Sequence, residues 1–487
     1  MLYEKELDIV LQEIITGWDI PGLAVGIVQG DEIVYTREFG VQSLETHTPV
    51  TLDSIFCVAS VSKAFVATAV MQLAERGKIS LDAPIVQYLP YFQMDDERYR
   101  QMTIRQMLSH TSGMPDMGEY EYDDLLANPE WDDGAAERYV RQLSSKKLIA
   151  NPGERFFYSN IAYNVLGDMI AKVTGKSFER AMQEYILMPA GMPNSTFLLA
   201  EVPPGLLAVP HLRSPEMKIN PVYPYHRADA PASFLHATVQ DMCHFAITSL
   251  KRGSMPGESI LSSTSYDLMW TPVADRGYKR GSMYEEIGLG WTLGHFKGVR
   301  TISHGGMGFG WSDFLFILPE KNSAAVILCN EESSARTRTV HAVADALIGQ
   351  KPQANTVSWM VPVSRALAEG GIRAAHARYA EIKASGDSAY YFDADDLANL
   401  ALQLLSARKP DLALEVLDFN IQVFPEHVES YLGQSSLFLQ KGEMARAEES
   451  LLKALSIDPE NPTALELRQR IHNTGLHAAT TPHKPVE

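Results

Sequence analysis

Three short motifs in this chain contain residue types that together can catalyse acyl transfer. Ser60-Val61-Ser62-Lys63 places a serine and a lysine three residues apart, and Tyr158-Ser159-Asn160 and His304-Gly305-Gly306 follow it. A serine hydroxyl attacks a carbonyl efficiently only when a neighbouring base removes its proton. That base is either a buried Lys63 with a lowered pKa or a tyrosine that the lysine holds as phenolate. The motifs therefore predict a covalent acyl intermediate on Ser60.

The first motif is expected to open a helix. Ser60 and Lys63 would then lie on one face of that helix, with their Cβ atoms about 5–6 Å apart. Unpaired N–H groups at a helix start also favour negative charge there. A lone motif of this kind is more typical of a serine N-cap and a solvated lysine, so the assignment depends on all three motifs occurring together. The helix itself is predicted from apolar residues that recur with helical period: Phe65, Val66, Ala69, Val70, Leu73 and Ala74.

The other two motifs are expected beside a predicted helix and a predicted strand. Tyr158 and Asn160 lie directly before a helix from about Ile161 to Val173, on a segment that can point side chains into a cleft. Asn160 is also placed to cap that helix. His304-Gly305-Gly306 ends the strand-like run 299–303. Two glycines at a strand edge would let a ligand approach the backbone closely.

In this order the three motifs resemble the serine β-lactamase and penicillin-binding-protein superfamily, with its class C β-lactamase-like esterase and D-aminopeptidase relatives. Two further segments, 103–115 and 172–178, strengthen the resemblance, which covers roughly residues 8 to 350. The resemblance implies a serine hydrolase that needs no cofactor and no metal. His110, inside the first of these segments, is expected to be a hydrogen-bonded structural residue rather than a base.

The resemblance also implies a role for each motif residue. Ser60 is the nucleophile, and Lys63 and Tyr158 transfer protons. The backbone N–H groups of Ser60 and Met307 form an oxyanion hole, whose donors are usually worth a few kcal/mol each in the transition state. The residues expected to contact the substrate are Asn160, which could instead orient Lys63, and His304, Gly305 and Gly306.

One residue departs from the pattern of this superfamily. His304 stands where many members have a lysine that contacts a substrate carboxylate. A neutral histidine holds a carboxylate less strongly than a lysine does. The sequence therefore favours a carboxylesterase acting on small acyl esters. The alternatives are a D-aminopeptidase or other amidase, a β-lactamase of the same mechanism, and a partner-binding scaffold whose hydrolase domain is inactive.

The composition restricts the classes of partner that the chain is expected to bind and its expected location. The chain has 487 residues, of which 45% are hydrophobic, and a formal net charge of −18. This charge argues against nucleic acid or an anionic membrane as partner, and leaves a small-molecule ester or amide as the expected substrate. Its first residues lack the basic flank and apolar core of a signal peptide, and no apolar run is long enough to span a bilayer. Cys57, Cys243 and Cys329 suit a reducing compartment. The expected location is cytoplasmic.

The order of elements predicts an α+β fold of the β-lactamase and transpeptidase type for residues 1–350. Strands from Leu23 to Val28 and from Ile33 to Phe39 form a hairpin, and a mostly helical insert follows at about 80–290. Strands at about 299–303, 311–318 and 324–329 return to the same antiparallel sheet, and a helix from about 334 to 348 closes it. The substrate cleft is expected between the sheet and the insert.

The last third of the chain predicts a second, helical domain at 351–475. Similar residues recur there at an offset of 34, the period of tetratricopeptide repeats, and a helical stretch from Val363 to Ser385 would supply a degenerate further repeat. The domain either binds a protein partner or self-associates, or it buttresses the hydrolase domain. Residues 476–487 are predicted to be a disordered tail. The matched positions are Leu404 with Phe438, Ala413 with Ala447, Leu417 with Leu451, and Pro425 with Pro459.

Overall fold

The computed structural model describes residues 2–118, 122, 125–252, 260–332, 335–353, 357–387, 390–459, 461, 463–465, 467–468 and 470–471. The predicted tail 476–487 lies outside these residues. The chain forms two compact units: Met1–His211 with Ile219–Ala354, and Leu212–Lys218 with Asn355–Glu487. Among the helices described, none combines the length and the apolar character needed to cross a bilayer.

The first unit is built on one antiparallel sheet whose strands are ordered β2-β1-β12-β11-β10-β9-β8-β7. The hairpin β1 and β2 and the late strands occur as predicted, and the α+β fold is confirmed. Strands β7 and β8 also join the sheet, although they fall within the predicted insert, and β9 joins it directly after the insert. The bounds are β1 Gly22–Gln29, β2 Glu32–Gly40, β7 Ala274–Asp275, β8 Glu286–Ile287, β9 Thr292–Phe296, β10 Val299–Gly308, β11 Trp311–Leu318 and β12 Ser323–Cys329.

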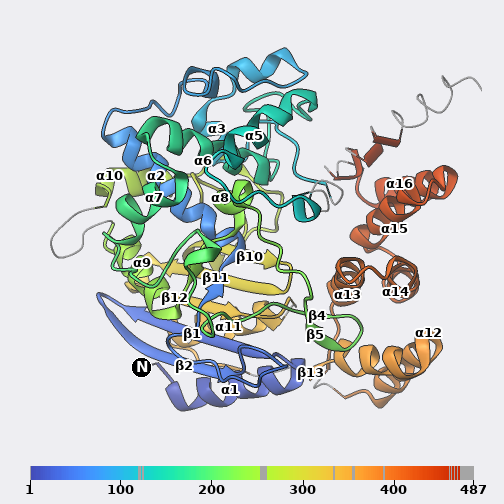
Figure 1. The fold of residues 1–487 in the computed structure, drawn as a ribbon. Coiled ribbons are helices and arrows are strands. Elements are labelled where there is room, and N and C mark those ends of the chain that lie inside the picture. Colours follow the sequence, from blue (N-terminus) through green and yellow to red (C-terminus); the bar gives the residue numbers. More distant parts are fainter. Residues whose placement is uncertain are drawn as a thin grey trace, which may run out of the picture. The chain divides into compact units, whose positions relative to one another are not determined.

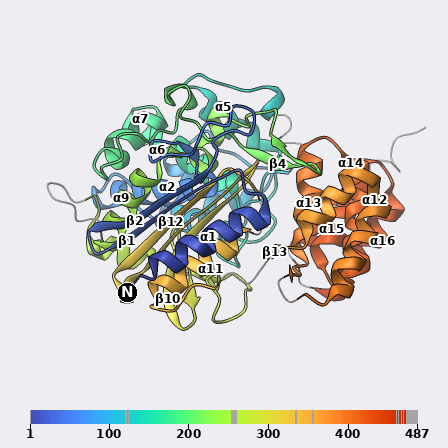
Figure 2. The ribbon, with the colours of Figure 1, turned by 90° about the horizontal axis from the view of Figure 1, so that it is seen from below.

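Helices cover both faces of this sheet (Figure 1). On one face, α1 (Glu4–Trp18) and α11 (Ala335–Leu347) lie next to each other across the strands, as Figure 2 shows. On the other face, α9 (Val239–Leu250) packs against β1 and β12. The central strands β11 and β12 are therefore buried along their whole length. This burial explains their continuous apolar sequence, because a strand covered on both faces has no solvent-facing positions.

The insert between β2 and β7 is mostly helical. Its long helix α6 (Asn160–Thr174) lies where the apolar period predicts it, and α2 (Ser62–Glu75) follows the first motif. A short ladder of β3 (Phe56–Cys57) with β6 (His236–Ala237) ties the start of the insert to its later part. The remaining helices are α3 Ile104–Leu108, α5 Ala135–Gln142, α7 Phe178–Met182, α8 Ala230–Ser233 and α10 Ser263–Met269.

The second unit consists of stacked helices. Helix α12 contains a break at Gly371, whose φ is 70°, and the matched apolar positions of the next two helix pairs are buried in two clusters. The 34-residue offset thus corresponds to two similar helix pairs, while their identity as tetratricopeptide repeats stays a prediction. The bounds are α12 Met360–Ser385, α13 Asp395–Ser406, α14 Pro410–Val423, α15 Val428–Gln440 and α16 Met444–Ile457, with short strands β13 Val357–Ser358 and β14 Tyr390–Tyr391.

A hairpin from the middle of the chain also belongs to the second unit. Strands β4 (His211–Arg213) and β5 (Met217–Ile219) pair with each other, and the turn between them contacts the helices. The Arg213 N–H donates to Gln403, Ser364 donates to the Pro215 carbonyl, and Lys409 donates to the Ser214 carbonyl. The sequence placed this segment in the hydrolase domain and offered no signal for its partners.

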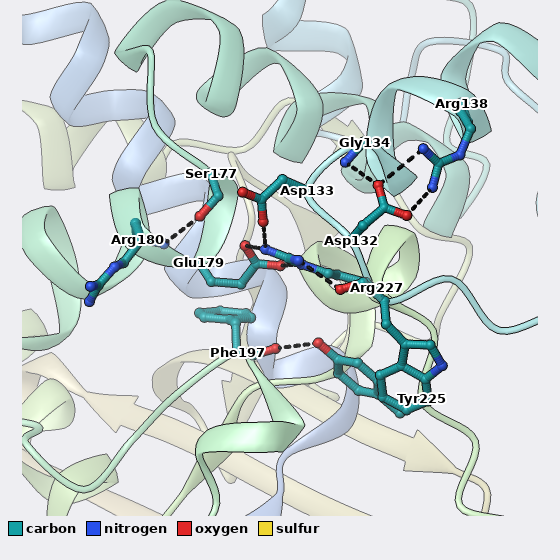
Figure 3. A network of polar contacts seen from close by, with 11 residues as sticks. Asp132, Asp133, Gly134, Arg138, Ser177, Glu179, Arg180, Phe197, Tyr225 and Arg227 are labelled. Atoms are coloured by element: carbon teal, nitrogen blue, oxygen red, sulfur yellow. Dashed lines mark hydrogen bonds and ion pairs between the residues drawn. The ribbon is translucent and has the colours of Figure 1, made fainter.

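A buried ion pair fixes the segment that leads into α8. Arg227 donates to both carboxylate oxygens of Glu179, at 2.6 and 3.0 Å, and also bonds Asp133 (Figure 3). The two side chains of the main pair are only 11% and 8% exposed. Nearby, the Tyr225 hydroxyl donates to the Phe197 carbonyl at 3.0 Å. These contacts hold residues 225–234 against the helices of the insert.

We expect Arg227→Leu to lower the free energy of unfolding by about 3–5 kcal/mol, because it leaves the Glu179 carboxylate buried without its partner. The matched control is Arg138→Leu, since Arg138 bonds Asp132 in the same region but is 45% exposed. Its Tm should change little. Thermal unfolding followed by circular dichroism measures both variants, and equal Tm values for the two would contradict the expected role of the buried pair.

Candidate active site

Ser60 lies in a 3-10 turn, Ala59–Val61, directly before α2. Ala59 has φ 43°, a left-handed conformation that residues other than glycine rarely adopt and that is concentrated at functional sites. The Ser62 hydroxyl holds this turn, since it donates to the Ala59 carbonyl at 2.6 Å and accepts from the Leu235 N–H at 2.9 Å. Ser60 thus occupies a strained turn, to which Leu235 from the later part of the insert is hydrogen-bonded.

Lys63 lies one turn further and is completely buried. Its Nζ is 3.0 Å from Ser60 Oγ, 2.7 Å from Asn160 Oδ1 and 2.7 Å from the Ala232 carbonyl. Burial lowers the pKa of Lys63 to about 7, against the opposing effect of nearby negative charge. A neutral amine is therefore available next to the serine hydroxyl near neutral pH.

Two buried carboxyl groups near Lys63 were not predicted from the sequence. Asp116 accepts from both the backbone N–H and the side-chain amide of Asn160, at 2.7 and 3.1 Å. Asp229 accepts from Asn164 at 2.7 Å. Burial raises the pKa of both groups, and both in turn raise the pKa of Lys63. Asp116 directly follows the segment 103–115, so the resemblance of that segment could have indicated it. No motif in the sequence points to Asp229.

Tyr158 completes the group around Ser60. Lys63 Nζ lies 5.0 Å from the centre of its ring, and Ser60 opposes the effect of burial on the Tyr158 pKa, so the tyrosine lies close to both residues. Burial raises the pKa of Tyr158 well above its ordinary range. These surroundings favour the protonated phenol of Tyr158. Of the two bases that the sequence suggests, they therefore favour the amine of Lys63 over a tyrosine phenolate.

His110 lies beneath Tyr158 with the two rings stacked at 4.3 Å between centroids. Its Nδ1 accepts from the Ser159 N–H at 3.1 Å, and burial lowers its pKa well below the ordinary value. A histidine held in this way positions the tyrosine motif. Ser159, not Asn160, caps α6, because its hydroxyl accepts from the Ala162 N–H at 3.1 Å. The side chain of Asn160 instead bonds Lys63 and Asp116.

The third motif lies inside a strand rather than after one, because β10 continues from Val299 to Gly308. A side chain at Gly306 would place its Cβ 2.4 Å from the Val58 carbonyl oxygen and 3.1 Å from the Ser60 backbone nitrogen. Only glycine therefore allows β10 to lie directly against the serine turn. Met307, the next residue, is 43% exposed and lines the same pocket as Ser60.

His304 is buried on the same strand, and its Nδ1 donates to the Gly305 carbonyl at 2.8 Å. Burial lowers the pKa of His304 to about 3, with Lys63, Arg276 and Arg336 adding to the effect. The imidazole is consequently neutral at neutral pH, which agrees with a weak carboxylate ligand at this position.

A pocket of about 340 Å³ opens to solvent beside Ser60. It brings Ser60, Asn160 and Met307 together, while His304, Gly305 and Gly306 are not among its lining residues. Four of its lining residues are aromatic, and two of them, Tyr122 and Phe309, meet edge to face at 5.3 Å between ring centres. The complete lining is Cys57, Ala59, Ser60, Tyr122, Asn160, Ser233, Phe234, Met307, Gly308, Phe309 and Trp311.

The chain matches the family model described as Beta-lactamase over residues 10–350. It therefore belongs to the β-lactamase family and is a serine hydrolase of that family. Penicillin-binding protein 4 of Amycolatopsis lactamdurans is 31% identical over 317 residues, which cover 64% of this chain and 81% of that protein. Beta-lactamase-like protein 2 of Dictyostelium discoideum is 30% identical over 279 residues, 55% of this chain. The match spans only about half, 49%, of that relative's length.

Solved structures agree with this assignment. An octameric penicillin-binding protein homologue from Pyrococcus abyssi is 26% identical with a TM-score of 0.62, covering 75% of this chain and 81% of its own. A class C β-lactamase from Rhodobacter sphaeroides shares the fold with a TM-score of 0.56 at 22% identity, covering 71% of this chain and 98% of its own.

Gly306→Ala should slow the labelling of Ser60 by a fluorophosphonate at least about tenfold, because the added methyl group pushes β10 away from the serine turn. Gly294→Ala is the matched control on the neighbouring strand β9. Its Cβ would lie 2.3 Å from the Ser282 carbonyl oxygen, so it strains the backbone equally but away from Ser60. Labelling rates per folded protein, measured by mass spectrometry, should fall only in the first variant. A similar fall in both would show that the close approach has no specific effect at Ser60.

Proposed function

We propose that this chain is a carboxylesterase that hydrolyses small acyl esters through an acyl-Ser60 intermediate. The observation that carries the proposal is the 3.0 Å contact between Lys63 Nζ and Ser60 Oγ in a site that lowers the pKa of the amine to about 7. A base with a pKa near the working pH is the most effective proton acceptor.

In the first half-reaction, Lys63 takes the Ser60 proton while Oγ bonds to the ester carbonyl carbon. The carbon–oxygen bond to the leaving group then breaks, and Tyr158 passes the proton from Lys63 to the leaving oxygen. In the second half-reaction, water gives its proton to the same groups, its oxygen bonds to the acyl carbon, and the Ser60 ester breaks with the proton returned to Oγ. The place of the Tyr158 ring beside Lys63, with its centre 5.0 Å from Nζ, supports this route.

The tetrahedral intermediate needs donors for its oxyanion. We assign these to the backbone N–H groups of Ser60 and Met307, and the close approach of β10 at Gly306 supports this assignment. Preorganised donors of this kind typically contribute about 2.7–4 kcal/mol each to transition-state stabilisation. Asn160 keeps Lys63 in place and faces the pocket.

Two features support an ester of a small acyl group over the alternatives. The pocket beside Ser60 is small, and the aromatic side chains of Phe234, Phe309 and Trp311 line part of it, so they can contact a small acyl group. His304 is neutral, so the position that often carries a lysine in this superfamily provides no charge for a β-lactam carboxylate. The relatives named as penicillin-binding proteins keep a D-aminopeptidase, another amidase or a β-lactamase as the alternative activity of the same centre.

A substrate panel separates these activities. It consists of short acyl p-nitrophenyl esters, D-amino-acid p-nitroanilides and a chromogenic cephalosporin. We expect the highest kcat/KM for the acetyl and butyryl esters. A higher value for an anilide or for the cephalosporin, after correction for intrinsic reactivity, would replace the esterase assignment with the corresponding alternative.

Ser60→Ala should reduce ester hydrolysis by several orders of magnitude without loss of fold, since no other nucleophile replaces the serine. A fluorophosphonate should label Ser60 in the wild-type protein. Ser62→Ala is the matched control, because Ser62 bonds the same turn but its hydroxyl points to Ala59 and Leu235. It should retain the label. Unchanged turnover in Ser60→Ala would contradict the assignment and leave the scaffold alternative.

The pH dependence tests the base. The kcat/KM for p-nitrophenyl acetate should rise with pH and level off above about 7, because only the neutral amine of Lys63 accepts a proton. Asp229→Asn should move this rise to lower pH, since the Asp229 carboxylate raises the pKa of Lys63. Asp168→Asn, which changes a buried carboxyl group bonded to Tyr91, should leave it in place. A profile that is flat across the neutral range excludes Lys63 as the base.

A further inference from the structure

The residues on either side of the hairpin 212–218 lie against the turn that joins β10 to β11. Before the hairpin, the His211 N–H donates to the Gly310 carbonyl at 3.4 Å. A side chain at Gly310 would place its Cβ 2.8 Å from the backbone of His211, so the two segments are in close contact. After the hairpin, the side-chain amide of Asn220 donates to the Phe309 carbonyl at 3.1 Å. Both flanks of the hairpin therefore touch the same turn.

This turn and the adjoining strand ends form one wall of the pocket beside Ser60. The Phe309 wall consists of Met307, Gly308, Phe309 and Trp311, which all line the pocket. Phe309 itself has φ 58°, a left-handed conformation that residues other than glycine keep only where their surroundings fix it. The hydrogen bond from Asn220 is such a contact, and it comes from outside β10 and β11. The position of the wall therefore depends on the segment that carries the hairpin.

The tip of the hairpin, residues 213–215, is bound by three polar side chains of the helical unit. Gln403 accepts from the Arg213 N–H, and Ser364 and Lys409 donate to the carbonyls of the next two residues. All three bonds go to backbone atoms of the hairpin, so they fix its path directly. Gln403 and Ser364 are buried, and a buried polar group that loses its partner costs free energy. The helices therefore favour one position of the tip.

We propose that the helical unit, through the hairpin 212–218, fixes the position of the Phe309 wall and so limits the size of the acyl group that the pocket accepts. Gln403, Ser364 and Lys409 are then positioning residues, which act through the hairpin and do not touch the substrate. This role differs from partner binding and self-association, because the ligand of the helices is a segment of the same chain. The proposal deepens the proposed function and rests on it, since it concerns the acyl group at the same pocket.

Two p-nitrophenyl esters test the proposal on the full-length protein, the acetate and the hexanoate, which share the leaving group and differ in the acyl chain. Gln403→Leu combined with Lys409→Met removes two of the three bonds to the tip. The ratio of kcat/KM for the hexanoate to that for the acetate should rise by about threefold to tenfold, a size typical of coupling through packed contacts, because the Phe309 wall is then free to move. Amide hydrogen exchange at residues 304–316, followed by mass spectrometry, should become faster in the same variant.

Lys441→Met is the matched control, because Lys441 bonds Asp411 elsewhere in the same helical unit, and it should change neither the ratio nor the exchange. A second variant replaces residues 213–217 by two glycines, which removes the tip without altering the helices, and should have the same effects as the first. An unchanged ratio in this variant, or unchanged exchange at 304–316, would overturn the proposal. Failure of the proposed function would instead show as no hydrolysis of either ester by the wild-type protein, and the exchange would still test whether the hairpin fixes the turn.

Discussion

The structure of the first unit depends on the burial of one primary amine. An ammonium group removed from water loses hydration free energy, and the protein compensates Lys63 with three oxygen acceptors and two nearby carboxyl groups. The compensation is partial, so the pKa falls to about 7 instead of staying near its ordinary value. A fully compensated lysine would stay protonated, and an uncompensated one would destabilise the fold.

Each element around the centre contributes to this balance. Helix α2 carries the lysine, α6 begins with the asparagine that accepts from it, and α8 supplies the Ala232 carbonyl. Strained or crowded backbone is needed where these elements converge, at Ala59, at His110 with φ 54°, and at the glycine of β10. Strained backbone of this kind persists only where the surrounding packing fixes it. The buried ion pair of Arg227 with Glu179 therefore contributes to the site indirectly, because it fixes the segment that leads into α8.

Sequence patterns predicted the parts of this structure that depend on residues close together in the chain. The α+β fold, the hairpin of β1 and β2, and helix α6 follow from apolar periodicity and turn residues, and the motif spacing predicted that Ser60 and Lys63 would meet. Asp229 was not predicted, because it acts on Lys63, which is far away in the chain, and it belongs to no local pattern. The continuation of β10 through Gly305 and Gly306 was also missed, since glycine ordinarily weakens a strand and here is required by the neighbouring turn.

The hairpin 212–218 has a consequence for how the chain folds during synthesis. Lys409, which bonds the Ser214 carbonyl, lies 195 residues further along the chain. At about 5–20 residues per second, the ribosome delivers that lysine roughly 10–40 seconds after the hairpin. During synthesis the hairpin therefore lacks these bonding partners until Ser364, Gln403 and Lys409 have emerged. A segment from the middle of the hydrolase sequence thus receives its hydrogen-bond partners from helices that are synthesised later.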